Sequence, residues 1–157
     1  MIVKKKVSEL LNEDTIILRD KVGGWREAVE LAGELLVNAG AVESRYVNRM
    51  VKMVEMYGSY IVLGNGVAIP HARPEDGVCK IGLSLVILKT PTCFLGREDC
   101  PVDILFGIAA VDNTSHQSVM SGLVTMLDDK SFLNKIRKAT NIEDILCLIE
   151  ETESEGT

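Results

Sequence analysis

The sequence lacks the features that secretion, membrane insertion and nucleic-acid binding require. Its longest apolar stretch, residues 104–111, is long enough for a strand but too short to span a bilayer. A mostly polar run through Asp14 follows the basic N-terminus, where a signal peptide would need an apolar segment. With 17 Lys and Arg against 23 Asp and Glu, the net charge of −6 disfavours nucleic acid and anionic lipid as partners. We therefore expect neither secretion nor direct membrane insertion.

Cysteine is sparse, and its spacing excludes the common redox and zinc motifs. No CxxC pair and no close histidine neighbour occur among the four cysteines, which are Cys79, Cys93, Cys100 and Cys147. We expect them to be small, packed and reduced thiols, which places the protein in the cytoplasm.

The length and composition fit a single folded domain, residues 1–157. The 46% of hydrophobic and 25% of charged residues are close to globular averages. A chain of 157 residues buries enough surface to fold without a disulfide or a structural metal. We expect the acidic C-terminal residues, 150–157, to form a frayed tail.

Apolar periodicity predicts helices toward both ends of the chain and strands in its middle. Helices are predicted from residue 25 to Gly40, from Ser44 as a cap to Gly58, from Thr114 to residue 127, over 132–136 and over 142–149. Strands are predicted over residues 15–18, 60–63, 67–69, 81–88 and 102–111. The last two runs are nearly continuously apolar, which is typical of central strands covered on both faces. The prediction is an α/β fold, a single-domain mixed β-sheet covered by helices on both faces.

Both histidines of the chain fall at boundaries between predicted elements. His71 directly follows Pro70, which cannot donate to a sheet ladder, so the strand should end there and project His71 into the polar loop 72–77. A neutral imidazole is a competent nucleophile toward phosphorus, and a pKa of about 6.5 leaves it mostly neutral in a cell. His71 is therefore a candidate phosphoryl acceptor.

His116 is predicted in the first turn of the helix that follows strand 102–111. Thr114 and Gln117 have the spacing of a capping box, with Thr114 as the cap. Ligands of α/β sheets collect beyond strand ends, and anions collect at helix N-termini, where free N–H groups point. The two histidines and an anion site could therefore meet.

Other interpretations of these residues stay open. Each histidine could only satisfy a local hydrogen bond at its boundary, and Arg73 could be a solvated loop charge. The segment Gly64-Asn65-Gly66 is a turn without the Gly-Lys-Ser/Thr of a phosphate loop, so no nucleotide or other cofactor is expected. A metal-dependent hydrolase could use both histidines, but no motif supplies an acidic third ligand, so we expect no metal.

Two segments resemble the motifs of a known family. Residues 64–73, GNGVAIPHAR, resemble the active-site signature of phosphotransferase-system enzyme IIA components of the mannitol/fructose type, in which the histidine after Ile-Pro is phosphorylated. Residues 106–116, FGIAAVDNTSH, resemble the segment that carries the family's second active-site histidine at the head of a helix. The resemblance covers nearly the whole chain and is greatest to the ascorbate-specific branch.

The resemblance implies a phosphoryl relay without metal or nucleotide. The phosphorylated histidine phosphocarrier protein would donate to His71, which would pass the group to a cysteine of an enzyme IIB serving a membrane transporter, while His116 stabilises the phosphoryl group. Mannitol members carry an active-site arginine sixteen positions before the histidine, where this chain has Glu55, so Arg73 is the candidate replacement. An apolar rim around His71 is expected to dock both partners. The alternative is a regulatory domain that is phosphorylated without onward transfer.

Overall fold

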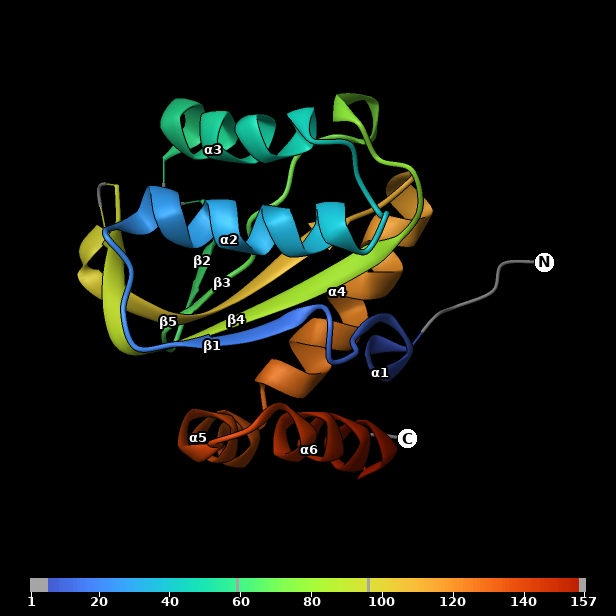
Figure 1. Ribbon diagram of the computed structural model, residues 1–157. Helices are drawn as coiled ribbons and strands as arrows, with labels where there is room; N and C mark the ends of the chain where they lie inside the picture. Colours follow the sequence, from blue (N-terminus) through green and yellow to red (C-terminus); the bar gives the residue numbers. More distant parts are fainter. Residues whose placement is uncertain (1–5, 59, 96, 156–157) are drawn as a thin grey trace.

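Five strands form one mixed sheet between two layers of helices (Figure 1). The structure is a computed structural model that describes residues 6–58, 60–95 and 97–155. In the order β1-β4-β5-β3-β2, the strands are β1 (Ile16–Arg19), β4 (Gly82–Phe94), β5 (Arg97–Ala109), β3 (Val67–Ala68) and β2 (Val62–Gly64). β1 runs parallel to β4 and β3 parallel to β5, whereas the β4–β5 and β2–β3 pairs are antiparallel. The predicted mixed sheet is confirmed.

Helices cover both faces of this sheet, as predicted. One face carries α2 (Trp25–Asn38) and α3 (Arg45–Tyr57) (Figure 1). The other carries α1 (Val7–Leu10), α4 (Asn113–Leu127), α5 (Lys130–Lys138) and α6 (Ile142–Glu155). None of the helices in the described ranges combines the length and hydropathy that a bilayer span needs.

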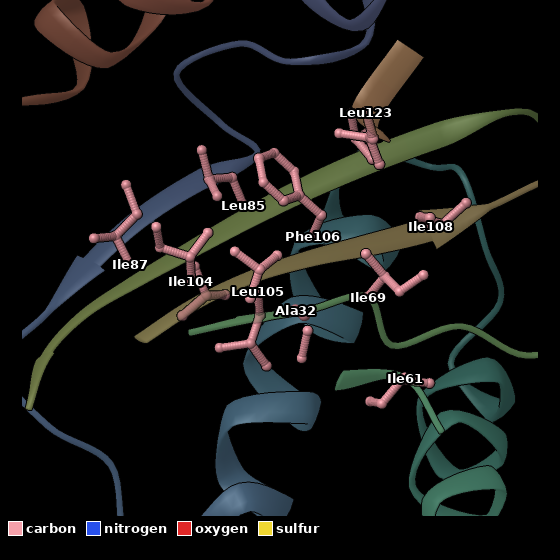
Figure 2. Close-up of a cluster of buried hydrophobic side chains, with 14 of the residues drawn as sticks. Ala32, Ile61, Ile69, Leu85, Ile87, Ile104, Leu105, Phe106, Ile108 and Leu123 are labelled. Carbon is pink, nitrogen blue, oxygen red and sulfur yellow. The ribbon is translucent and has the colours of Figure 1, made fainter. Parts of the chain in front are cut away.

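The core lies on both sides of β4 and β5. Successive residues of a strand point to opposite faces, so Leu105 packs toward Ala32 of α2 while Phe106 packs toward Leu123 of α4 (Figure 2). Gly107 lies beneath α2, and a Cβ there would collide with the Ser84 hydroxyl and crowd Ala32 of α2. The absence of a side chain at Gly107 therefore lets α2 lie directly on the sheet.

β4 and β5 extend further than predicted, as one long hairpin. Residues 82–88 of β4 are buried, but the strand continues through exposed positions to Phe94, with Thr92 paired to Val102. Apolar continuity detects only the buried half of such a hairpin. In the outer half, backbone pairing continues although most of the β4 side chains before the buried Phe94 are exposed.

The ends of the helices mostly follow the expected signals. Gly58 ends α3 at φ 71°, and Gly40 follows α2 at φ 75°, a region that glycine adopts without steric penalty. Ser44 lies at the N-cap of α3 as predicted, but its hydroxyl makes no capping hydrogen bond.

The expectation of a frayed C-terminus is wrong for the residues that the structure describes. α6 continues through Glu155, because the Glu153 carboxylate accepts hydrogen bonds from the Val7 N–H at 2.7 Å and from Ser8. This contact links the last turn of α6 to the start of α1. Residues 1–5, which hold most of the basic N-terminus, and residues 156–157 lie outside the described ranges.

The expectation of packed thiols is also wrong. All four cysteines are free; Cys79, Cys93 and Cys147 are exposed, and Cys100 is partly buried. Cys93 and Cys100 lie on the solvated half of the β4–β5 hairpin, and Cys147 lies on the outer side of α6. The apolar character of cysteine did not decide its burial here, because these elements place their core side chains at other positions.

Candidate active site

His71 lies where the chain leaves β3, held against β5 by its backbone. The Ile108 N–H donates to the Pro70 carbonyl at 3.1 Å, and His71 itself forms a parallel β-bridge with Ile108. The pairing therefore continues one residue past Pro70, and the loop begins at Ala72. As a result His71 is half-buried and has a fixed backbone.

The His71 ring has one committed nitrogen and one available nitrogen. Its Nδ1 lies 2.8 Å from the carbonyl oxygen of Ile69, which can only accept a hydrogen bond, so Nδ1 carries the proton in the neutral ring. The lone pair is then on Nε2. A neutral imidazole in this tautomer can attack an electrophile such as phosphorus through Nε2.

The structure brings His116 to His71. Their ring centroids lie 5.1 Å apart, with the ring planes inclined by 47°. The His116 backbone N–H already donates to the Asp112 carbonyl at 3.0 Å, so the group that His116 can offer a ligand is its ring. Two imidazoles thus face one small region at the end of β5.

The cap of α4 differs from the prediction. Asp112, not Thr114, is the N-cap, with extended backbone and a carboxylate that accepts from the Ser115 N–H at 2.8 Å. Hydrogen bonds from the backbone and the side chain of Ser115 lower the pKa of the Asp112 carboxyl. Aspartate caps at least as well as threonine, and its charge suits a helix N-terminus, so the helix starts two residues earlier than predicted.

Burial lowers the pKa of His116 below its ordinary value of 6.5, and the neighbouring His71 lowers it further. His116 is therefore neutral near pH 7 and keeps one ring N–H as a donor. A neutral donor stabilises charge on a bound phosphoryl group without forming a permanent ion pair with it.

We predict that His116 titrates below pH 6.5 in NMR spectra, and that His71→Ala raises its pKa part of the way back by removing the neighbouring charge. Because the folded-state pKa lies below the unfolded one, the unfolded chain binds the proton more readily. Stability should therefore fall as the pH drops through about 6.5 toward the folded-state pKa. A His116 midpoint at or above 6.5 would contradict this environment.

Two tyrosines extend the site from the end of α3. The Tyr60 ring meets His71 edge-on with centroids 5.8 Å apart, and Tyr57 lies beside Tyr60 at 6.0 Å. Burial raises the pKa of Tyr60, the neighbouring Tyr57 adds to this, and the positive charge of Arg73 opposes it. The positive charge of Arg73 is therefore close enough to influence Tyr60, the tyrosine that contacts His71.

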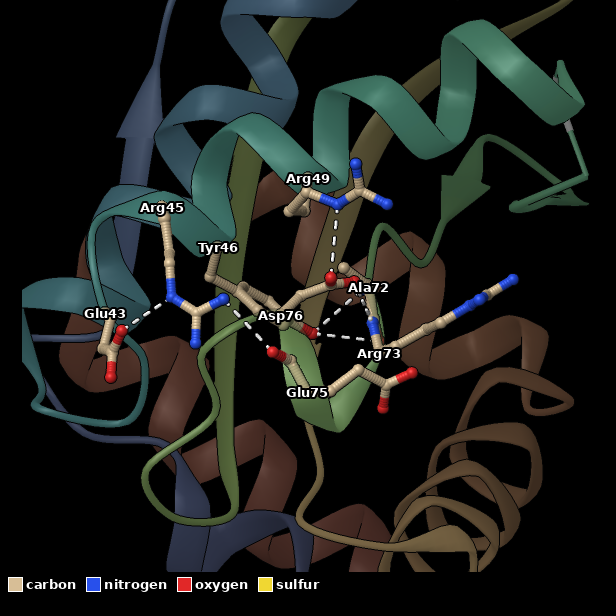
Figure 3. Close-up of polar contacts among 8 residues, drawn as sticks. All are labelled: Glu43, Arg45, Tyr46, Arg49, Ala72, Arg73, Glu75 and Asp76. Atoms are coloured by element: carbon tan, nitrogen blue, oxygen red, sulfur yellow. Dashed lines mark hydrogen bonds and ion pairs between the residues drawn. The ribbon is translucent and has the colours of Figure 1, made fainter.

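The loop after His71 places Arg73 and its neighbours. Pro74–Asp76 form a short 3-10 helix, and the Arg73 N–H donates to Asp76 Oδ2 at 3.0 Å. The exposed Arg73 guanidinium points away from Asp76 (Figure 3). Glu55, in the position of the mannitol-type arginine, instead pairs with Arg26 of α2 at 3.2 Å.

Two residues of α3 that hold this loop were missed by the sequence reasoning. Arg49 Nε lies 3.2 Å from Asp76 Oδ1, and the buried Tyr46 hydroxyl bonds to Ala72 (Figure 3). The same hydroxyl also bonds to the Ile108 carbonyl. Tyr46 and Arg49 are three apart, so they share one side of α3. No local pattern connects them with a loop 26 and 27 residues further along the chain.

The chemistry of this site suits transfer of a small anionic group. It combines a free imidazole lone pair, a second neutral imidazole and a nearby guanidinium. In the described ranges, no group of three or more His, Cys, Asp or Glu side chains could hold a metal ion.

Comparison with known proteins identifies the class. The chain belongs to the EIIA 2 family of the phosphoenolpyruvate-dependent sugar phosphotransferase system, which matches residues 9–152. It is therefore a phosphotransferase component, as the resemblance of its two histidine segments implied.

Within this family, the chain is similar to components for ascorbate and for mannitol. The chain is 40% identical over 144 residues to the ascorbate-specific PTS system EIIA component of Salmonella typhimurium, covering 91% of this chain and 94% of the relative. The mannitol-specific cryptic phosphotransferase enzyme IIA CmtB of Escherichia coli has a similar structure, with a TM-score of 0.85, 27% identity and coverage of 94% and 99% of the two chains. The mannitol enzyme IIA of Escherichia coli, solved in complex with phosphorylated enzyme IIB, matches with a TM-score of 0.80, 31% identity and coverage of 90% and 97%.

Proposed function

We propose that this chain is a cytoplasmic phosphocarrier for ascorbate uptake that is phosphorylated on His71. The observation that carries the proposal is the His71 ring, with Nδ1 bonded to Ile69 and Nε2 free beside His116. Nε2 attacks the phosphorus of the phosphorylated histidine phosphocarrier protein, and the donor's N–P bond breaks. A cysteine thiolate of enzyme IIB then attacks the same phosphorus, the bond to Nε2 breaks, and His71 returns to its neutral form.

The neighbours of His71 supply positioning and charge stabilisation, which is most of what phosphoryl transfer needs. The neutral His116 ring donates a hydrogen bond to the phosphoryl oxygens. Arg73 supplies positive charge from the loop, a role that Glu55 cannot take because it is acidic and pairs with Arg26. No cofactor or metal enters these steps.

The choice of substrate and partner follows from the relatives. The curated relatives at about 40% identity are named as ascorbate-specific components. The complex of the similar mannitol enzyme IIA with phosphorylated enzyme IIB supports an enzyme IIB as acceptor for this chain too. The transporter that the enzyme IIB serves would carry ascorbate, which this chain itself never needs to bind.

Exposed apolar side chains around His71 form a docking surface that we call the apolar rim: Tyr57, Tyr60 and Val111. Tyr57 and Tyr60 form an aromatic chain that ends on His71, and Val111 precedes the Asp112 cap of α4. Donor and acceptor must each reach one phosphoryl group while excluding water from it. An apolar surface around the nucleophile meets both needs.

Tyr57→Ser should raise the KM for both protein partners about tenfold, the effect of losing about 1.4 kcal/mol of interface energy from one aromatic anchor. The kcat should stay near the wild-type value, because Tyr57 does not touch His71. The matched control is Leu95→Ser, which removes a similarly exposed apolar side chain at the tip of the β4–β5 hairpin, at the opposite end of β5 from Ile108. Equal KM values for the two variants would place docking elsewhere.

Arg73→Gln should slow phosphoryl transfer about tenfold, because one charged donor to the phosphoryl group is lost. Arg49→Gln tests the other cation near the loop, whose Nε is already committed to Asp76. Single-turnover rates of both variants decide between them. If transfer were slower in Arg49→Gln and unchanged in Arg73→Gln, the charge that stabilises the phosphoryl group would come from Arg49 of α3 rather than from Arg73 of the loop.

Phosphoryl transfer to enzyme IIB tests the proposal as a whole. Phosphorylated protein is mixed with the enzyme IIB of an ascorbate system and, separately, of a mannitol system, and the phosphoprotein is followed over time. We expect rapid transfer to the ascorbate enzyme IIB. Stable phospho-His71 with no accepting enzyme IIB would instead support the regulatory alternative.

A further inference from the structure

The buried hydroxyl of Tyr46 lies at the junction between the chain that carries His71 and the strand beside it. Tyr46 is fully buried on α3, and its ring is part of the core. Its oxygen accepts from the Ala72 N–H at 2.9 Å and donates to the Ile108 carbonyl at 2.8 Å. The Ala72 carbonyl is a second, more distant neighbour at 3.3 Å.

These contacts fix the backbone on the C-terminal side of His71. On the N-terminal side, the Ile108 N–H already holds the Pro70 carbonyl at 3.1 Å. On the other side no sheet partner is available to Ala72, because the chain turns into the 3-10 helix Pro74–Asp76. The Tyr46 hydroxyl takes the place of that missing strand, since it connects Ala72 to the carbonyl of the residue that His71 pairs with.

The direction of the His71 ring depends on this backbone. The ring bonds through Nδ1 to the carbonyl two residues earlier, Ile69, and this local bond requires the chain from Ile69 to Ala72 to keep its shape. If the Ala72 end were free, the Nδ1 bond would compete with solvent and the opposite tautomer would become populated. Burial raises the pKa of the Tyr46 phenol to about 12, so the hydroxyl stays protonated and can donate.

We propose that Tyr46 is a positioning residue for phosphoryl transfer, whose hydroxyl ties Ala72 to Ile108 and so holds His71 with Nε2 toward the partner. The inference rests on the proposed phosphorylation of His71. It assigns to α3 a function beyond packing, because the nucleophile is oriented from a helix on one face of the sheet.

Tyr46→Phe tests the proposal because it keeps the buried ring and removes only the hydroxyl. We expect kcat for phosphorylation to fall about 10- to 100-fold, the effect of a small misplacement of a reacting group, while the KM for the donor stays within about twofold. Nitrogen-15 spectra of the His71 ring should show the Nε2–H tautomer gaining population. These two readouts do not respond to a loss of stability alone.

Thr15→Val is the matched control, because it also removes a buried hydroxyl that both accepts and donates. Thr15 Oγ1 accepts from the Asn12 N–H at 3.0 Å and donates to the Asn12 carbonyl at 3.2 Å. Thr15 directly precedes β1, which is the edge strand at the opposite end of the sheet from β3 and β2. The Thr15→Val variant should lose stability but keep the wild-type kcat and the wild-type His71 tautomer. The proposal would be overturned if kcat fell equally in both variants. It would also be overturned if Tyr46→Phe kept the wild-type kcat and the wild-type His71 tautomer.

Amide hydrogen exchange of the wild-type protein provides a test that needs no variant. The Ala72 N–H should be protected although it lies in a surface loop, because its acceptor is buried. Exchange at the rate of a free peptide would overturn the proposal even if Tyr46→Phe does not fold. If the wild-type protein accepts no phosphate, the proposed function fails, whereas the exchange and tautomer measurements still decide whether Tyr46 orients the ring.

Discussion

His71→Ala should reduce phosphorylation by the phosphorylated histidine phosphocarrier protein to background, because the variant lacks the nucleophilic Nε2. The fold should be kept, since the half-buried ring makes one local hydrogen bond, to the Ile69 carbonyl two residues earlier. Radiolabelled phosphate transfer and a melting curve measure the two effects. The phosphoryl bond of the wild-type protein should be labile in acid and stable in base, as expected for a phosphoramidate.

The control for this variant is His116→Ala, which removes the other imidazole of the pair. It should still be phosphorylated, so that only His71 behaves as the acceptor. Phosphate retained on His71→Ala would refute the assignment of the nucleophile. A large fall in the melting temperature of His71→Ala would show that the ring is structural and that lost phosphorylation reports unfolding.

His116→Ala should pass phosphate to enzyme IIB about a hundredfold more slowly than the wild-type protein. The reason is that loss of one preorganised donor to a transferring charged group costs about 3 kcal/mol in the transition state. The variant should lose less than about 1 kcal/mol of stability, because Asp112, rather than any residue of the predicted capping box, caps α4. Single-turnover transfer and denaturant unfolding provide the two numbers.

The conservative variant His116→Gln separates hydrogen bonding from packing. Glutamine keeps an N–H donor of similar reach, so it should recover part of the rate that alanine loses. Transfer at wild-type speed in His116→Ala would show that the ring only fills space beside His71. Equal loss in alanine and glutamine variants would assign its role to the imidazole ring itself.

The sequence was most informative where local chemistry decides the structure. The predicted turn Gly64-Asn65-Gly66 is present and takes positive φ at all three residues. The continuous apolar runs do form the central strands β4 and β5. In these segments a residue's own backbone preference, or burial on both faces, is sufficient to specify the conformation.

It was least informative where partners distant in the chain decide the structure. The extra bridge at His71 depends on Ile108, and the helical end of α6 depends on Glu153 reaching the start of α1. The role of Tyr46 was not predicted, because its two backbone partners come from other elements. Asp112 as the cap could have been predicted locally, because aspartate is a favoured N-cap residue, but the capping-box spacing of Thr114 and Gln117 favoured Thr114 instead.

The most direct test of the central claim is the location of the phosphoryl group and its fate. Protein with nitrogen-15 in its histidines is phosphorylated by the donor and followed by nitrogen and phosphorus NMR while an ascorbate-type enzyme IIB is added. The account predicts one phosphohistidine, bonded at Nε2 of His71 with Nδ1 still protonated, which disappears as a phosphocysteine forms on enzyme IIB. Phosphate at Nδ1 of His71 or on His116, or a phosphohistidine that enzyme IIB leaves unchanged, would contradict it.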